Sequence, residues 1–261
     1  MWSLMLAIER KNEILEKLRQ EQRVLVSELS VHYGVTEETI RRDLDKLERE
    51  GYATKTYGGA IWGNSTKSDL SYIVRNKTNI EAKRAIARTV ASMIHNGDHI
   101  MLDESSTSLF VAKELKESKK ELTLITNSVE IVMELRDVSG WNIMSTGGRL
   151  LPNSLELSGP QCHQMLRNHH VDKLIMSCKG IDPTAGITDS SEYHSSTKQT
   201  MLASAQKVIL ALDHTKFDKI SFVKIADFRT LCAVVTDRAP SREWQEFFER
   251  LQLPCRFPEA L

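Results

Sequence analysis

Apolar residues at the start of the chain recur at helical spacing. Ile14 and Leu18 predict a helix over residues 8–20. A second, shorter helix is expected over residues 26–33, because Gly34 follows it as a left-handed cap would. The chain therefore begins with two short helices joined closely in sequence.

A third helix carries the clearest apolar stripe. Thr36 is a good N-cap for a helix that runs to about residue 50. At about 100° per residue, Ile40, Leu44 and Leu47 fall within roughly 60° of one another. This stripe predicts a face packed on the other two helices.

A hairpin and a polar stretch follow. Residues 52–57 are rich in Thr and aromatics and precede two glycines, which is typical of a β-hairpin. Helix, helix, turn, helix and hairpin together predict a winged helix-turn-helix domain at residues 1–60. The polar residues 63–68 predict a linker spanning residues 61–79.

The remaining chain alternates helical patterns with short apolar runs. The runs are residues 99–102, 122–125, 142–144, 173–176, 208–212 and 232–235. Buried strands that alternate with helices favour a parallel α/β sheet. We therefore expect residues 80–261 to form an α/β domain.

Composition excludes several classes of protein. The 261 residues include 35 Lys and Arg and 35 Asp and Glu, a formal net charge of zero, which argues against a polybasic tail or an acidic solvating chain. The apolar start is cut short at Glu9, so neither a secretory signal nor a membrane span is expected. Four widely spaced cysteines favour a reducing cytoplasm over a disulfide framework.

The outward face of the third helix is polar and charged. Such side chains can bond to base edges or reach phosphates. The alternative is a solvated face on which Glu38 pairs with Arg42 and Asp45 with Arg49, and the charge pattern alone favours it. The candidate DNA-binding residues are Thr36, Glu38, Thr39, Arg41, Arg42, Lys46 and Arg49, with Lys55 on the wing.

The charge of the first domain sharpens this hypothesis. Residues 1–60 hold ten Lys and Arg against eleven Asp and Glu, a net charge of −1, whereas DNA-binding domains are usually basic. Five of the ten basic residues fall within residues 41–55. We therefore expect DNA binding that depends on a few placed arginines, with weak non-specific affinity and strong reliance on oligomerisation.

A longer signature points to a family. Arg10, Ile14, Leu18, Thr36 and the run 39–44 match, position by position, the helix-turn-helix signature of the DeoR family of bacterial transcriptional regulators. The sequence Tyr-Gly-Gly-Ala near the wing resembles that family's His-Gly-Gly-Ala, with Tyr in place of His. The resemblance implies that the third helix contacts a double-stranded DNA operator, foremost through Thr39, Arg41 and Arg42.

Polar loops follow several of the predicted strands. They lie at residues 102–108, 125–128, 145–149, 177–180 and 212–216. Ligands of open α/β sheets bind at the carboxyl ends of strands, and a helix start with three hydroxyl groups beside it suits a phosphate or another anion. Each loop taken alone has a structural alternative as a helix cap, a turn or a surface ion pair.

The second domain also resembles the sensor domain of the DeoR family over most of its length. That domain is similar in fold to ribose-5-phosphate isomerase and to glucosamine-6-phosphate deaminase, and it usually senses phosphorylated sugars or their metabolites. By this resemblance residues 103 and 105–107 hold the phosphate, with lysines and Asp213 nearby. The candidate effector-binding residues are Asp103, Ser105, Ser106, Thr107, Thr126, Asn127, Gly147, Gly148, Lys179, Gly180, Lys198, Asp213 and Lys216.

One loop departs from the family pattern. The family commonly has Asp-x-Gly-Thr-Thr, whereas this chain has Ser105 in place of the glycine and adds a carboxylate at Glu104. An effector with less negative charge than a sugar phosphate therefore stays open.

An enzyme is the main alternative from another class. Sugar-phosphate isomerisation needs a carboxylate base, for which Asp182, Asp189 or Asp213 is available, and a polarising group such as Lys179 or Lys216. A DNA-binding module ahead of such a fold favours a protein that reports the ligand. We therefore expect no enzymatic activity.

Histidines and cysteines give no metal motif. Cys162, His163, His169 and His170 are close in sequence, but a helix over residues 161–169 would separate Cys162 from His163, so neither a metal nor a cofactor is expected. His194 and His214 lie near the candidate loops, where either an effector contact or a capping role is open.

Together these patterns predict a cytoplasmic, sequence-specific DNA-binding regulator. We expect a repressor of a carbohydrate catabolic operon, controlled by a phosphorylated sugar or a related metabolite. One recognition helix covers only a half-site, so a homodimer or homotetramer assembled through the second domain is expected, with no membrane partner. The alternatives are a sugar-phosphate isomerase or deaminase-like enzyme carrying a DNA-binding module, and a DNA-architectural protein, which the neutral charge disfavours.

Overall fold

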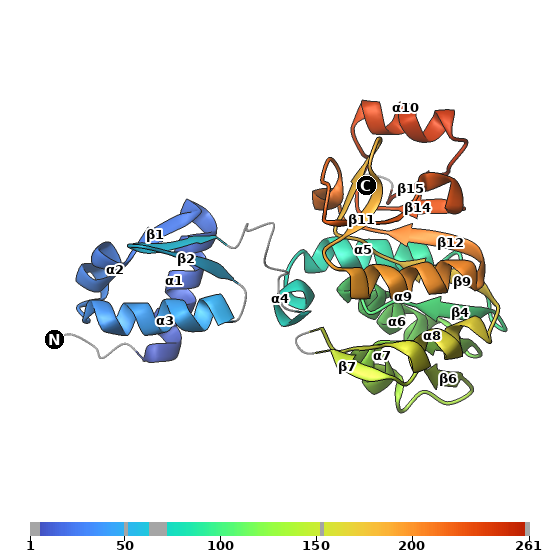
Figure 1. Ribbon diagram of the computed structural model, residues 1–261, viewed down its shortest axis with the longest axis horizontal. Coiled ribbons are helices and arrows are strands. Elements are labelled where there is room, and N and C mark those ends of the chain that lie inside the picture. Colours follow the sequence, from blue (N-terminus) through green and yellow to red (C-terminus); the bar gives the residue numbers. More distant parts are fainter. Residues whose placement is uncertain (1–5, 50–51, 63–71, 152–153, 259–261) are drawn as a thin grey trace. The chain divides into compact units, whose positions relative to one another are not determined.

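The computed structural model describes residues 6–49, 52–62, 72–151 and 154–258 (Figure 1). The chain divides into two compact units, Met1–Arg75 and Asn76–Leu261. Within the stretch expected to be a linker, residues 61 and 62 end a strand and Tyr72–Lys77 forms helix α4. The polar run 63–68 lies outside the described residues.

The first unit holds three helices and a three-stranded sheet among its described residues. The elements are α1 (Ala7–Glu21), β1 (Arg23–Leu25), α2 (Val26–Tyr33), α3 (Glu37–Arg49), β2 (Ala53–Thr56) and β3 (Gly59–Trp62). The strands pair antiparallel in the order β1-β3-β2. The three helices and the β2-β3 hairpin confirm the predicted winged helix-turn-helix; β1 was not predicted, because three residues between two helices are too short for a recognisable alternation.

The predicted caps explain where these helices start and stop. Gly34 adopts φ 62°, the left-handed conformation that ends α2. Thr36 Oγ1 accepts a hydrogen bond from the backbone N–H of Thr39 at 3.3 Å, at the start of α3. Gly59 has a different reason to lack a side chain: a Cβ there would lie 2.0 Å from the carbonyl oxygen of Val24, where β1 pairs with β3.

Apolar side chains from all three helices meet in the core of this unit. Ile14, Leu29, Ile40, Leu44 and Leu47 are fully buried, as the apolar stripes predicted. A buried ion pair accompanies them and links the first helix to the third. Arg10 Nε lies 2.7 Å from Asp43 Oδ2, and the two side chains are 9% and 3% exposed.

The second unit is built around a parallel sheet with seven strands among its described residues. Its order is β15-β14-β12-β9-β4-β5-β6, and every pairing within it is parallel. Its strands are β4 (His99–Leu102), β5 (Thr123–Thr126), β6 (Asn142–Ser145), β9 (Val171–Met176), β12 (Ala205–Ala211), β14 (Ala233–Val235) and β15 (Cys255–Arg256). The six predicted runs all form strands of this sheet. The two-residue β15 was not predicted.

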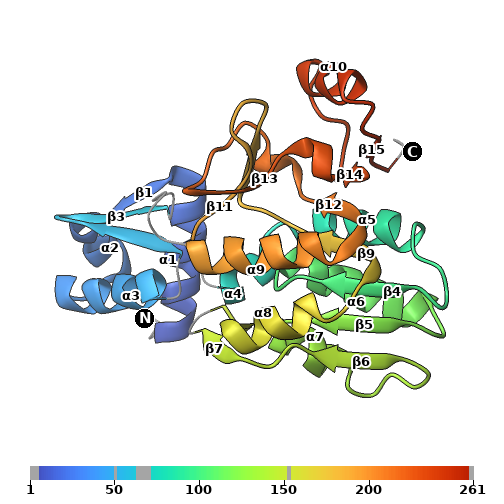
Figure 2. The same ribbon diagram turned by 45° about the vertical axis from the view of Figure 1, so that its right-hand side comes forward.

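Helices cover both faces of the sheet. The helices are α5 (Ile80–Ala91), α6 (Ser106–Ser118), α7 (Val129–Leu135), α8 (Pro160–Arg167), α9 (Glu192–Ala203) and α10 (Arg242–Arg250), with 3-10 turns η1 (His214–Lys216) and η2 (Phe228–Thr230). Helices α5, α6 and α7 pack together, whereas α8 and α9 pack together on the other face (Figure 2). Right-handed crossovers dictate this division, because the strand order reverses between β4 and β9.

The second unit also contains two small antiparallel sheets. They are β7-β8 (Arg149–Leu151 and Glu156–Ser158) and β10-β11-β13 (Gly180–Asp182, Gly186–Asp189 and Val223–Ala226). Neither was predicted, since their strands are too short to show a period. No helix in the described part of the chain is both long and apolar enough to cross a membrane.

We expect Asp43→Asn to destabilise the first unit by about 3 kcal/mol, because the substitution leaves the Arg10 guanidinium buried without its counter-charge. Amide hydrogen exchange of the full chain, followed by mass spectrometry on peptides from α1 and α3, measures the change. Glu38→Gln is the control: it removes the exposed partner of Arg42 and should cost below ~0.5 kcal/mol. Equal effects of the two substitutions would contradict a structural role for the buried pair.

Candidate functional site

The outer face of α3 carries the predicted arginines, each paired with a glutamate of the same helix. Arg41 Nη2 lies 2.6 Å from Glu37 Oε2, and Arg42 Nε lies 3.3 Å from Glu38 Oε1. All four side chains are exposed, at 48% or more. The Glu38–Arg42 pair of the solvated-face alternative is thus formed in the free protein. Exposed pairs of this kind contribute little to stability, so both arginines can change partner.

The wing lies beside this helix. The ammonium group of Lys55 on β2 pairs with Asp45 of α3, and its backbone N–H donates to Glu48 Oε1 at 2.8 Å. Lys46 is exposed on α3, whereas the side chain of Arg49 lies outside the described residues. Thr36 Oγ1 and Thr39 Oγ1 share a hydrogen bond of 2.9 Å at the helix start. The exposed face of α3 and the wing therefore form one surface, and Lys55 lies where the two meet.

A second site lies in the other unit, at the carboxyl ends of β4 and β9. The strand order reverses between these neighbours, which is the position where open α/β sheets bind ligands. Asp103 follows β4, is fully buried, and accepts a hydrogen bond from the backbone N–H of Ser177, after β9, at 2.9 Å. It also accepts from Ser105 N at 3.1 Å and from Ser108 Oγ at 2.5 Å. Asp103 therefore ties the two loops together.

Lys198 of α9 joins a third element to this position. Its Nζ lies 2.7 Å from Asp189 Oδ2 and 3.3 Å from both Asp103 Oδ2 and Glu104 Oε1. It also donates to the carbonyl oxygen of Ser177 at 3.0 Å. The lysine and the three carboxylates are all buried, so the ammonium lies among charges that water does not screen.

The protonation of this cluster follows from its charges. Burial alone would lower the pKa of Lys198, but the surrounding carboxylates, Asp189 foremost, raise it well above its ordinary value. For Glu104 burial opposes ionisation, yet Lys198 and His194 together hold its pKa below the usual range. Burial and the neighbouring charge of Glu104 raise the pKa of Glu156 to about 8. The cluster therefore holds a charged lysine and carboxylates of unequal acidity.

The hydroxyl groups at the start of α6 divide into two kinds. Ser105 is the N-cap: its Oγ accepts from Ser108 N and donates to Ser108 Oγ, both at 3.0 Å. The side chains of Ser106 and Thr107 are 5% and 4% exposed and form no side-chain hydrogen bond among the described residues. Of these hydroxyls, Ser106 and Thr107 are the ones free to bind a ligand.

The next strand end contributes a buried amide. Thr126, at the end of β5, donates its hydroxyl to the carbonyl oxygen of Leu102 at 2.8 Å, which fixes it against β4. Asn127 is fully buried and donates to the carbonyl oxygen of Leu157 at 3.4 Å. Its Oδ1 has no hydrogen-bond partner among the described residues. Thr126 thus has a structural bond, whereas Asn127 retains an acceptor.

The glycines of the predicted site have packing reasons of their own. A Cβ on Gly180 would lie 2.3 Å from the carbonyl oxygen of Lys219. Gly148 has φ 109°, and a Cβ there would lie 2.7 Å from the carbonyl oxygen of Ser158. Gly147 has φ 65° with open space around it. Close backbone approach accounts for Gly148 and Gly180, and backbone conformation for Gly147.

The loop after β12 forms a separate polar group. Asp213 is buried and accepts from Thr215 N at 2.9 Å; burial acts to raise its pKa, but Lys216 and Thr215 hold it lower. Among the described residues no hydrogen bond or ion pair joins Asp213 or Lys216 to Lys198. Lys179 is half-buried in the loop after β9. The structure thus brings Asp103 and Lys198 into contact and leaves Asp213 with Lys216.

Four residues of the cluster were absent from the predicted effector site: Glu104, Glu156, Asp189 and His194. The sequence marked Glu104 only as a departure from the family pattern and Asp189 only as a possible catalytic base. His194 Nδ1 lies 3.5 Å from Glu104 Oε1, and its Nε2 lies 3.5 Å from Glu156 Oε2. The imidazole thus contacts two carboxylates, whereas the cap of α9 is Ser191. For Glu156 the sequence offered one signal, a single charged residue between Leu155 and Leu157. For His194 it offered only the position near the candidate loops.

The residues considered as a catalytic base or as metal ligands have hydrogen-bond partners close by. Asp182 accepts from the backbone N–H groups of Thr184 and Ala185, both at 2.8 Å, as a turn residue does. His163 Nε2 lies 3.3 Å from Thr197 Oγ1, and His169 Nδ1 lies 2.8 Å from the carbonyl oxygen of Met165.

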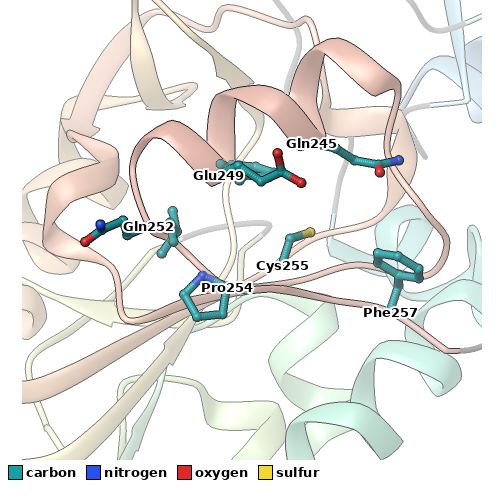
Figure 3. Close-up of a pocket in the computed structure, with 8 residues that line it drawn as sticks. Gln245, Glu249, Gln252, Pro254, Cys255 and Phe257 are labelled. Carbon is teal, nitrogen blue, oxygen red and sulfur yellow. The ribbon is translucent and has the colours of Figure 1, made fainter.

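A hollow of about 370 Å³ lies elsewhere, between α10 and β15 (Figure 3). Its lining includes Gln245, Glu249, Gln252 and Cys255, and Glu249 is the charged member. Burial raises the pKa of the Cys255 thiol to about 11, so that thiol is unreactive at neutral pH. This hollow therefore lacks the converging charges found at the β4–β9 position.

Comparison with known proteins identifies both units. Residues 10–66 match the DeoR-like helix-turn-helix domain, and residues 78–238 match the DeoR C terminal sensor domain. The HTH-type transcriptional regulator YulB of Bacillus subtilis is 39% identical over 233 residues, covering 89% of this chain and 90% of the relative. The HTH-type transcriptional repressor GlcR of the same species is 35% identical over 242 residues, covering 93% of each chain.

Among solved structures, ribose 5-phosphate isomerase A from Methanocaldococcus jannaschii aligns with a TM-score of 0.40 and 14% identity, covering 54% of this chain and 55% of that one. The family matches cover the winged helix and most of the α/β unit, and the relatives align over nearly their whole length. The chain belongs to the DeoR family of DNA-binding transcriptional regulators.

Proposed function

We propose that this protein is a transcriptional repressor of a carbohydrate catabolic operon, which contacts its operator through α3 and the wing. The observation that carries the DNA-binding surface is the exposure of Arg41 and Arg42, which among the described residues pair with glutamates of the same helix. On DNA each guanidinium exchanges a glutamate for a guanine edge or a phosphate. The printed name of the relative GlcR supports repression.

The proposed effector is a phosphorylated sugar or a related metabolite, bound at the carboxyl ends of β4 and β9. Ser106 and Thr107 offer hydroxyl groups at the N-terminus of the 13-residue helix α6, where the helix dipole favours an anion. Asp103 and Lys198 lie directly behind this loop. Glu104 adds a carboxylate to it, which favours an effector that carries hydroxyl or amino groups to donate to that carboxylate.

Binding must alter the affinity for DNA through a difference between two conformations of the sensor unit. The proposed assembly is a homodimer or homotetramer formed through the sensor unit, because one recognition helix covers a single half-site. A protein that binds chromosomal DNA in bacteria acts in the cytoplasm, which is the proposed location. The proposed domain division is a DNA-binding domain at residues 1–60, a linker at 61–79 and a sensor domain at 80–261.

We expect Arg41→Ala with Arg42→Ala to weaken operator binding by about 100-fold or more, since each lost contact is worth roughly 1–3 kcal/mol. Fluorescence anisotropy with an operator selected from random DNA by the full-length chain measures the affinity, and circular dichroism checks the fold. Arg84→Ala is the matched control, because Arg84 is an exposed arginine paired with Glu81 on a helix of the sensor unit. Unchanged operator affinity in the double variant would refute the assigned surface.

Replacing Ser106 and Thr107 by Ala should leave operator affinity unchanged and raise the effector concentration for half-release by about tenfold or more, because two hydrogen bonds to a charged group are lost. A panel of sugar phosphates is screened first by thermal shift, and release is then titrated with the compound that binds. The matched control combines Ser92→Ala with Ser118→Ala, whose hydroxyls bond to backbone carbonyls of their own helices. Normal release from the double variant would exclude this loop as the effector site.

The protein is proposed to bind its effector without turnover. Lys198 neutralises Asp189, and backbone N–H groups of a turn occupy Asp182, so neither carboxylate is placed as a free base. Incubation of the full-length protein with each sugar phosphate that binds, followed by NMR, should return the compound unchanged. Steady isomerisation that is lost in Asp213→Asn would support the enzyme alternative instead.

A further inference from the structure

Three ligand-type side chains converge behind the β4–α6 loop. One ligand atom from each of Glu104, Glu156 and His194 lies within 4.8 Å of the other two. They come from three elements far apart in the sequence: the end of β4, the start of β8 and the first turn of α9. The sequence predicted no metal site, because these residues share no motif.

Glu156 is the observation that points to an absent partner. Its side chain is fully buried, yet neither of its carboxylate oxygens accepts a hydrogen bond from any described residue. The same holds for Oε2 of the buried Glu104. Ionising a buried carboxyl group whose oxygens accept no hydrogen bond is costly. Within the described chain the imidazole of His194, 3.5 Å away, is the group that can pair with it.

The surrounding charges favour a cation. Four buried carboxylates, those of Asp103, Glu104, Glu156 and Asp189, surround this region. Lys198 lies against three of them, which leaves Glu156 beside the imidazole. A divalent ion would add positive charge to a cluster in which four carboxyl groups face one ammonium and one imidazole. The three ligand atoms lie close enough together to be ligands of one ion.

We propose that Glu104, Glu156 and His194 bind a first-row divalent transition metal ion such as Zn²⁺. Two ligand atoms on one tetrahedral zinc ion, each about 2.1 Å from it, lie roughly 3.4 Å apart, so the three side chains would rotate toward one another to share one ion. Imidazole favours Zn²⁺ over Mg²⁺, which takes oxygen ligands and retains its waters. Three protein ligands leave a coordination position open for water or for an oxygen of a bound small molecule.

The geometry of His194 fits this role. One ring nitrogen lies near Glu104 and the other near Glu156, both at 3.5 Å. Whichever nitrogen binds the ion, the carboxylate beside the other nitrogen is itself a proposed ligand, so one of its oxygens would bind the ion while the other accepts the imidazole proton, and such a partner orients metal-bound histidines in proteins.

The test is isothermal titration of the full-length protein with Zn²⁺, after treatment with a chelator and its removal. The wild type should bind one equivalent, and His194→Gln and Glu156→Gln should each weaken that binding by about 100-fold or more, because even the loss of a partner outside the ligand shell costs about 10–100-fold. His214→Gln is the matched control: His214 Nδ1 also faces a carboxylate, that of Asp237 at 2.7 Å, and within the described ranges it pairs with no second one. It should leave the Zn²⁺ affinity unchanged.

If the wild type binds no Zn²⁺, or if both site variants bind Zn²⁺ as tightly as the wild type, the proposal is overturned and His194 is a histidine that shares a proton with two carboxylates. If a variant does not fold, the absorption spectrum of the wild type loaded with Co²⁺ decides the matter. Weak ligand-field bands alone fit nitrogen and oxygen ligands, whereas an intense thiolate charge-transfer band would place the ion on a cysteine and contradict this site. Neither readout involves DNA or a sugar phosphate, so the result is independent of the proposed function.

Discussion

The buried ammonium group of Lys198 is the interaction on which the sensor unit depends. It reaches from α9 to carboxylates that follow β4 and β11, and to the carbonyl oxygen that follows β9. An unpaired charge in this position would cost several kcal/mol, so each partner requires the others to be in place. One side chain therefore joins a helix on one face of the sheet to the two strand ends where the order reverses.

This arrangement gives the candidate effector site its shape. Asp103 is held from three sides by Ser105, Ser108 and Ser177, and it fixes the loop that opens α6. The hydroxyls of Ser106 and Thr107 are left for a ligand because Ser105 already serves as the cap. A ligand that repels or attracts the charges around Lys198 would act on β4, β9 and α9 at the same time. A sensor requires such an effect, because ligand binding must change the conformation of the unit.

The DNA-binding unit differs from the sensor unit in where its charges lie. The charged side chains described on α3 are mostly at the surface, and the Arg10–Asp43 ion pair is buried. The Arg10–Asp43 pair joins α1 to α3, while the apolar stripe of α3 packs on the same core. Since these contacts determine which way α3 faces, Arg41 and Arg42 remain on the outside. Their glutamate partners explain how a domain of net charge −1 can still present guanidinium groups to an operator.

Much of the secondary structure could be predicted from the sequence alone, because the signals that mark helices and strands are local. The apolar stripe of Ile40, Leu44 and Leu47, the caps at Gly34 and Thr36 and the six apolar runs each depend on residues close together in the chain, and the structure confirms them. The DeoR family was likewise identified from a spaced signature, and the family matches confirm it.

Only the tertiary structure decided which polar residues meet. Glu156 lies about thirty residues or more before Asp189 and His194 in the chain, and a lone charge in a short strand has no period to mark it. Charged side chains gather there because the ends of β4, β9 and β11 and the first turns of α9 meet where the strand order reverses. The sequence therefore determined the family, the helices of the first unit and the predicted strands of the large sheet. The partners of Lys198 depend on the tertiary structure, which brings distant elements together.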